Sequence, residues 1–97
     1  KAHELRSTSP AIIDSLGWAY FLTGDHDRAV TYLESALEGQ PQDPTINEHL
    51  GDAYWTVGRL YEARYAWRSA KLFAEDEDLL RLARKIDIGL MPDLVSP

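Results

Sequence analysis

Apolar and small side chains recur along the chain with a period of 34 residues. Residues 10–43 and 44–77 align without a gap, and ten of the 34 aligned pairs are identical. Average composition would give about two identities by chance. The identical pairs are Pro10/Pro44, Ile12/Ile46, Leu16/Leu50, Gly17/Gly51, Ala19/Ala53, Tyr20/Tyr54, Gly24/Gly58, Ala29/Ala63, Ser35/Ser69 and Ala36/Ala70. A fixed period of this length is typical of stacked repeat proteins, in which one unit relies on its neighbours to bury its apolar face.

Capping residues and glycines divide each unit into two helices. Ser9 and Asp43 are N-capping residues, and each precedes a proline, which the first helical position tolerates. Gly24 and Gly58 then interrupt the pattern, and such short breaks join antiparallel helix hairpins. The predicted helices run over about residues 10–23, 26–38, 44–57 and 60–74.

The segment after the second unit repeats the spacing of a first helix. Its apolar positions arrive two residues early for a strict period, at Leu79, Leu82, Ala83 and Ile86. This spacing predicts a capping segment over residues 77–90, with a final helix over about residues 77–88. The bases Arg81, Arg84 and Lys85 are expected to be exposed and to solvate the end of the array.

The two ends of the chain carry different expectations. Ala2 lies 34 residues before Ala36, so residues 1–9 are interpreted as the end of a preceding, truncated repeat. Residues 91–97 contain two prolines and are expected to form a mobile tail.

The residues at the expected helix contacts point to a family. The first unit reads Ile13-x2-Leu16-Gly17-x2-Tyr20, then Ala29-x3-Leu33, Ala36 and Pro41, and the second reads Asn47-x2-Leu50-Gly51-x2-Tyr54, then Ala63-x3-Trp67 and Ala70. This pattern resembles the tetratricopeptide repeat. It departs from that repeat at Ile13 and Asn47, where an aromatic residue is usual, and at Glu75, where a closing proline is usual.

The resemblance implies an all-α fold, an α-α superhelix or solenoid of antiparallel helix hairpins. It implies a single domain with about two full repeats, and the chain also resembles a fragment of a larger bacterial protein with many such repeats. Small side chains of the motif would let paired helices approach closely, and larger ones would fill the space around these contacts. These motif residues are Leu16, Gly17, Tyr20 and Ala29 in the first unit and Leu50, Gly51, Tyr54 and Ala63 in the second.

In this family the first helix of each repeat lines a concave groove, so the resemblance places two helical faces there. The residues expected to contact a ligand are Asp14, Trp18, Phe21, Leu22, Glu48, Asp52 and Trp55. Acids and large aromatics without a base favour a basic or amphipathic peptide, whose apolar side chains would meet the aromatics. Trp18 is expected to be the most exposed aromatic. The alternative readings are that Phe21 and Trp55 form core between repeats, and that the acids only solubilise the surface.

Charge and the absence of cysteine narrow the classes of partner. Sixteen acids against ten bases give a formal net charge of −6, which disfavours nucleic acid because phosphate binding needs a clustered basic face. No apolar run approaches the about 18 residues of a membrane span, so direct membrane insertion is not expected. The chain has no cysteine, and both cytoplasmic and bacterial periplasmic locations remain open.

No catalytic or metal-binding constellation accompanies these residues. His49 and Asp52 lie one turn apart beside Glu48, but no second histidine follows in the spacing of a zinc site. Paired carboxylates lack a nucleophile or a glycine-rich phosphate loop. The sequence therefore predicts a non-catalytic protein-interaction or scaffold module without a cofactor. The alternative is a structural segment that extends a repeat array or self-assembles, and the fragment itself could then be a homo-oligomer.

Overall fold

Consecutive α-helices make up most of the computed structural model, which describes residues 8–97. They are α2 (Pro10–Leu22), α3 (His26–Gly39), α4 (Pro44–Thr56), α5 (Leu60–Phe73) and α6 (Asp76–Ile88), followed by the short 3₁₀ turn η1 (Pro92–Leu94). Each helix begins and ends within one residue of its predicted bounds. The described residues contain no strand, and the predicted all-α fold is confirmed.

Local capping chemistry sets the ends of these helices. The Asp43 carboxylate accepts a hydrogen bond from the Ile46 N–H at 3.0 Å, so an otherwise unpaired N-terminal donor of α4 is satisfied. The turns within the hairpins pass through Gly24 and Gly58, whose φ angles are +94° and +90°. Because this left-handed conformation is costly for other residues, the two glycines end α2 and α4 at equivalent positions.

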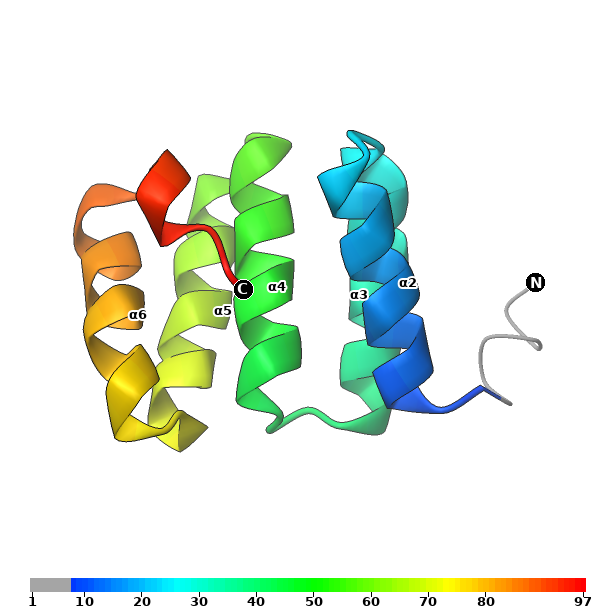
Figure 1. Cartoon of the computed structure of the whole chain (residues 1–97), viewed down its shortest axis with the longest axis horizontal. Coiled ribbons are helices and arrows are strands. Elements are labelled where there is room, and N and C mark those ends of the chain that lie inside the picture. The colour runs from blue at the N-terminus through cyan, green and yellow to red at the C-terminus, as the bar shows by residue number, and fades with distance from the viewer. Residues whose placement is uncertain (1–7) are drawn as a thin grey trace.

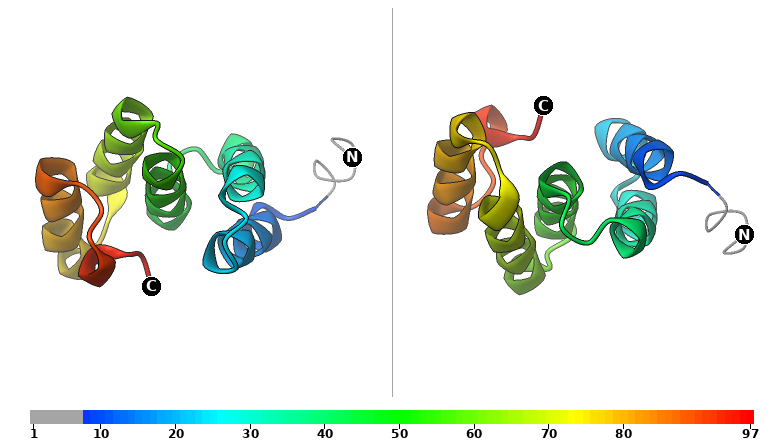
Figure 2. Two further views of the ribbon diagram at one scale, coloured as in Figure 1. Left: turned by 90° about the horizontal axis from the view of Figure 1, so that it is seen from above. Right: turned by 90° about the horizontal axis from the view of Figure 1, so that it is seen from below.

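The helices form two layers. α2, α4 and α6 lie on one side of the molecule, and α3 and α5 lie on the other, as Figure 2 shows. Each helix packs mainly against its neighbours in sequence, so the hairpins stand side by side in a row (Figure 1). We call the surface of α2, α4 and α6 that points away from α3 and α5 the inner face.

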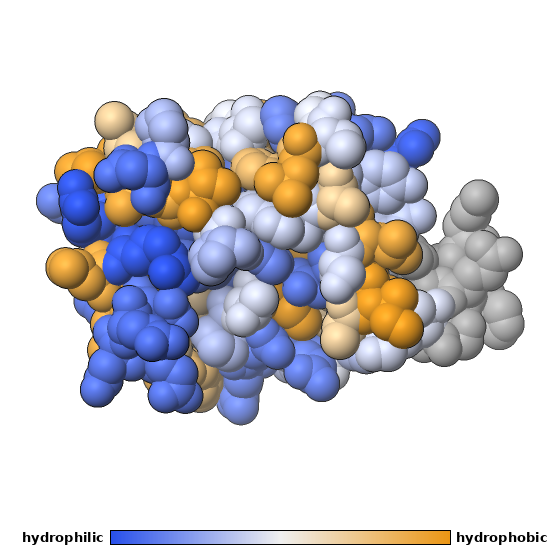
Figure 3. Space-filling view, in the orientation of Figure 1, coloured by the Kyte–Doolittle hydropathy of each residue, from blue (hydrophilic) through white to orange (hydrophobic). Residues whose placement is uncertain are grey.

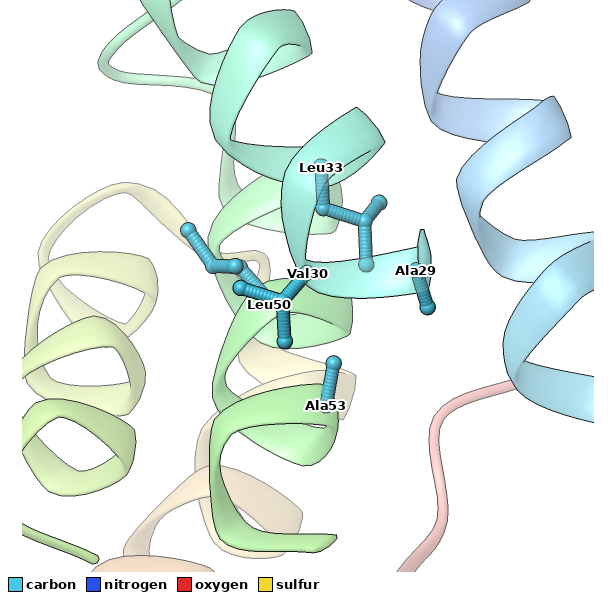
Figure 4. Close-up of a cluster of buried hydrophobic side chains, with 5 residues drawn as sticks. All are labelled: Ala29, Val30, Leu33, Leu50 and Ala53. Carbon is cyan, nitrogen blue, oxygen red and sulfur yellow. The ribbon is translucent and has the colours of Figure 1, made fainter. Parts of the chain in front are cut away.

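Close approach between helices depends on the motif glycines. A Cβ atom at Gly51 would lie 2.4 Å from the indole of Trp67 on α5, and one at Gly17 would lie 2.8 Å from Leu33 on α3. Between the repeats, Ala29, Val30, Leu33, Leu50 and Ala53 form a buried apolar cluster (Figure 4). The same cluster joins α4 of the second unit to α3 of the first.

Leu16 differs from its expected role. Leu50 is 2% exposed because it packs against α3 of the preceding unit, whereas its counterpart Leu16 is 45% exposed. The leucine of the motif therefore packs between repeats rather than inside its own hairpin, which differs from the expectation that Leu16 fills the space around the hairpin contacts. The interpretation of residues 1–9 as the end of a preceding repeat falls mainly outside the described residues.

Asn47 occupies a position where the family usually has an aromatic residue. Its side chain is buried, and its amide nitrogen donates hydrogen bonds to the main-chain oxygens of Pro41 at 3.1 Å and Asp43 at 3.0 Å. The side chain thus ties the turn between the repeats to the start of α4.

The C-terminal part of the chain corrects two expectations. Lys85 was expected to be exposed, but its side chain is fully buried, and Arg81 is partly buried. Residues 91–97 were expected to be mobile, but they form η1 and bury Leu94 and Ser96. Both differences have one cause, because α6 and the segment after it pack against α4 on the inner face (Figure 1).

Candidate functional site

The expected ligand-contacting residues come from α2 and α4, but most of them are covered. Trp18 was expected to be the most exposed aromatic, yet it is 9% exposed. Phe21 and Trp55 are partly buried. Leu22, at the end of α2, is 66% exposed. The four that are buried are Asp14, Trp18, Glu48 and Asp52.

A cation from α6 meets two of the expected acids. The Lys85 ammonium donates to the Glu48 carboxylate at 2.6 Å and to the Asp52 carboxylate at 2.9 Å. Arg81, one turn earlier, binds both oxygens of Glu48 with two parallel hydrogen bonds of 2.7 Å. Such bidentate pairs are among the strongest side-chain interactions. The expected acidic face is therefore compensated from within the chain.

Asp52 accepts hydrogen bonds from several elements at once. Besides Lys85, it accepts from the indole N–H of Trp67 at 3.0 Å, and from the main-chain N–H and the hydroxyl of Ser96 at 2.8 and 2.7 Å. In the described part of the chain, no buried side-chain nitrogen or oxygen lacks a partner. Asp52 thus connects α4, α5, α6 and the C-terminal segment.

The pKa of Glu48 is held below its ordinary value of 4.5. Burial alone would raise this pKa, but the hydrogen bonds and charges of Arg81 and Lys85 outweigh burial and favour the ionised form. A carboxylate whose pKa is lower in the folded state stabilises the fold above its unfolded pKa, and this contribution disappears as the pH falls through the folded value.

We therefore expect the free energy of unfolding to decrease as the pH falls below about 4.5, since protonation of Glu48 then opposes folding. Urea denaturation between pH 7 and pH 3 measures this decrease. A Glu48→Gln variant should show a smaller decrease over this range, whereas the exposed Glu38→Gln variant should behave as the parent chain. Equal pH dependence in all three proteins would contradict the role of the ion pairs at Glu48.

An aromatic cluster joins α2 to α4. The Trp18 ring stacks on Phe21 at 4.4 Å and on His49 at 4.0 Å, with interplanar angles of 5° and 14°. The Nδ1 atom of His49 lies 2.9 Å from the Asp14 carboxylate, and its Nε2 atom lies 3.4 Å from the main-chain oxygen of Pro97. Both nitrogens of His49 therefore face acceptor oxygens.

Trp55 lies near the C-terminal end of α4. Its ring packs against Trp67 at 5.7 Å and beneath the guanidinium of Arg64 at 5.1 Å. A Cβ atom at Gly89, just after α6, would lie 2.4 Å from the Trp55 ring. Trp55 thus packs against the apolar cluster of α5 and α6, and its role as a ligand contact stays a prediction.

The sequence analysis missed four residues of this site: His49, Arg81, Lys85 and Ser96. One signal was present for two of them, since the acids Glu48 and Asp52 and the bases Arg81 and Lys85 share the same four-residue spacing. Residues four apart lie on one face of a helix, so two such faces can pair residue by residue. Ser96 follows no periodic pattern, and no signal in the sequence indicates it.

Two further features are absent from residues 8–97. No group of three or more histidine, aspartate or glutamate side chains is arranged to hold a metal ion. In the same part of the chain, no helix is long and apolar enough to cross a membrane.

Comparison with known proteins agrees with the repeat structure. Residues 10–53 match the family model of the tetratricopeptide repeat. A TPR repeat-containing protein of Pseudomonas aeruginosa is 42% identical over 52 residues, which is 54% of this chain and 9% of the relative. The chain thus spans less than a tenth of the length of that relative. No solved structure matches the chain. Together with the repeated motif and the row of helix hairpins, these matches support a tetratricopeptide repeat assignment, and the family match itself covers residues 10–53.

Proposed function

We propose that this chain is a non-catalytic protein-interaction module that binds an extended, amphipathic peptide segment on the inner face of α2, α4 and α6. Tetratricopeptide repeats generally mediate protein–protein interactions. One observation carries the choice of surface. The chain's own C-terminal segment already lies on the inner face, where the main-chain N–H of Ser96 donates to Asp52 at 2.8 Å. An extended segment therefore fits this surface.

The pairing of the acids decides between a basic and an amphipathic partner. Glu48 and Asp52 each contact a cation of α6, and Asp14 contacts His49. A lysine or arginine from a ligand would have to compete with these groups. Apolar contact surface is still available at Leu22 and at the partly exposed rings of Phe21 and Trp55. These observations favour the amphipathic segment over a strongly basic one.

Selection of peptides from a random display library, followed by affinity measurement on the whole chain, tests the proposal. We expect Leu22→Glu to weaken the selected peptides at least about tenfold, since it places a charge in an apolar contact. The matched control is Leu72→Glu on α5 in the outer layer, where the leucine is 78% exposed and should not contact the peptide. Selected peptides that respond to Leu72→Glu instead would contradict binding on the inner face, and a chain that selects no peptide would contradict the function.

A second candidate is assembly of repeats, and one observation favours it. Ile12, Leu16 and Ala19 are exposed on α2, whereas their counterparts one repeat later are buried against α3. Figure 3 shows apolar surface on the side of α2 that ends the row of helices. Another helix, from a further repeat or a second copy, would cover this face. A mass that increases with concentration in sedimentation, and that Leu16→Lys abolishes, would support this candidate.

A further inference from the structure

We propose that residues 90–97 are an intramolecular occupant of the peptide site, and that the partner segment which replaces them carries the same short pattern. This pattern is an aliphatic residue followed, two positions later, by serine or threonine. The inference deepens the proposed function and rests on it. It names both the competitor of the partner and the chemistry that the partner must present.

The path of the segment is set by Gly89. Its φ angle is +88°, a conformation that side chains rarely adopt, and it ends α6 at the point where the chain turns back. A side chain here would also collide with the Trp55 ring, because a Cβ atom would lie 2.4 Å from it. The glycine therefore lets the chain turn back beside the Trp55 ring. Figures 1 and 2 show the segment returning towards α4 on the inner face.

Two side chains of the segment are buried, and Leu90 at its start is partly buried against the cluster of α5 and α6. Leu94 and Ser96 are both buried, at 4% and 6% exposure, whereas Asp93 within η1 is exposed. Val95 between them has φ −57° and ψ 140°, which is close to polyproline II geometry. The burial of Leu94 and Ser96, two positions apart, defines the pattern.

Ser96 is recognised through both properties of its hydroxyl group. The hydroxyl donates to Asp52 at 2.7 Å and accepts from the Lys85 ammonium at 3.0 Å. Only a group that is donor and acceptor at one atom satisfies both neighbours. A carboxylate would be repelled by Asp52, and alanine would offer neither bond. Threonine carries the same hydroxyl, so the site discriminates for serine or threonine at this position.

The surroundings of Ser96 remain paired when the segment leaves. Asp52 keeps its bonds to Lys85 and to the Trp67 indole, and Lys85 keeps Glu48. Water can take the place of the Ser96 hydroxyl and main-chain N–H. Departure of the segment therefore leaves no buried charge without a partner, and the helices do not depend on it in the way they depend on Lys85.

The site also has room beyond the segment. A cavity of about 70 Å³ lies beside Pro97, between α4 and α6, and Thr45, Glu48 and Arg81 line part of its wall. A partner segment can extend past the position of Pro97 into this space. A longer partner would gain contacts there that residues 90–97 do not make.

Competition between the segment and a free peptide tests the inference. A fluorescent peptide with the sequence of residues 90–97 is titrated against the parent chain and against a Ser96→Asp chain, whose new carboxylate faces Asp52. The tethered segment competes with the free peptide at an effective concentration of roughly 1 mM. If the free peptide binds the empty site with a Kd of about 0.1 mM, this competition weakens its binding to the parent chain about tenfold. We expect the peptide to bind the Ser96→Asp chain about tenfold more tightly than the parent chain.

Matched controls separate release of the segment from other effects. Met91→Asp adds the same charge at an exposed position of the segment and should bind the peptide as the parent does. We call the Ser96→Asp chain, whose own segment has left the site, the released chain. A peptide with Ser96→Thr should bind the released chain as well as the original peptide does, and a peptide with Ser96→Ala should bind it about tenfold more weakly. Circular dichroism checks that the Ser96→Asp chain is folded. Leu94→Asp serves as a second releasing variant if it is not.

Each contrary outcome identifies which idea fails. Equal peptide affinity for the parent and both releasing variants would overturn the role of residues 90–97 as a competitor. A released chain that ignores this peptide but still binds library peptides through Leu22 would overturn the serine pattern and leave the proposed function intact. No binding of any peptide to the parent or the released chain would overturn the proposed function. A dimer that the peptide dissociates would overturn the intramolecular assignment, because the segment would then exchange between two copies.

Discussion

Replacement of Lys85 with methionine is expected to lower the free energy of unfolding by about 3–5 kcal/mol. Methionine has a similar length, so the packing around the chain changes little. The loss arises because Glu48 and Asp52, at 5% and 0% exposure, remain buried without their shared cation. Replacing both partners of a buried ion pair with apolar residues often changes the free energy of unfolding little. Removing only one partner lowers it strongly, because the remaining charge is left in a medium that solvates it poorly.

Urea denaturation followed by circular dichroism measures this loss, and α6 provides the control. Arg84 precedes Lys85 on the same helix and is exposed, so Arg84→Met removes the same formal charge from the surface. Such a surface change usually stays within about 0.5 kcal/mol. Equal effects of the two substitutions would mean that Lys85 is solvated in solution and that α6 does not dock on α4 as described.

Truncation of Leu50 to alanine is expected to cost about 2–5 kcal/mol, whereas the same change at Leu16 should cost about 1 kcal/mol or less. The two leucines occupy one position of the repeat, so helix propensity and local sequence are closely matched. They differ in burial, because α3 covers Leu50 and no described element covers Leu16 to the same extent. The difference between the two variants therefore measures the contact between repeats.

The same denaturation experiment, repeated at several protein concentrations, also tests whether a second copy of the chain covers the exposed face of α2. A cost at Leu16 close to that at Leu50 would contradict an open α2 face in solution. If that cost also grew with protein concentration, a second copy would be covering the face, which would favour assembly over peptide binding.

The helices and their register could be predicted because their determinants are local. Proline after a capping residue starts α2 and α4, and glycines with positive φ end them. The 34-residue period then places equivalent residues at equivalent positions without any knowledge of distant contacts. The buried Asn47 was a departure from the family pattern, and the turn before it supplies the main-chain oxygens that its amide needs.

The chemical state of the inner face could not be predicted in the same way. Glu48 and Asp52 were expected to await a basic ligand, but their partners lie 33 residues later on a helix whose orientation the period does not determine. Ser96 lies further still, in a segment with no repeat and with two prolines nearby. Its contact with Asp52 depends on a single glycine that turns the chain back over α4.

Polar side chains also connect the inner layer from one hairpin to the next. Asp14 reaches His49, Glu48 reaches Arg81, and Asp52 reaches Lys85. Each of these links joins helices that are not consecutive in the chain, so a tensile load along the row would have to break hydrogen bonds at every junction. These links lie only on the inner face of the row. The row would therefore resist bending that stretches the inner face more than bending that stretches the outer layer.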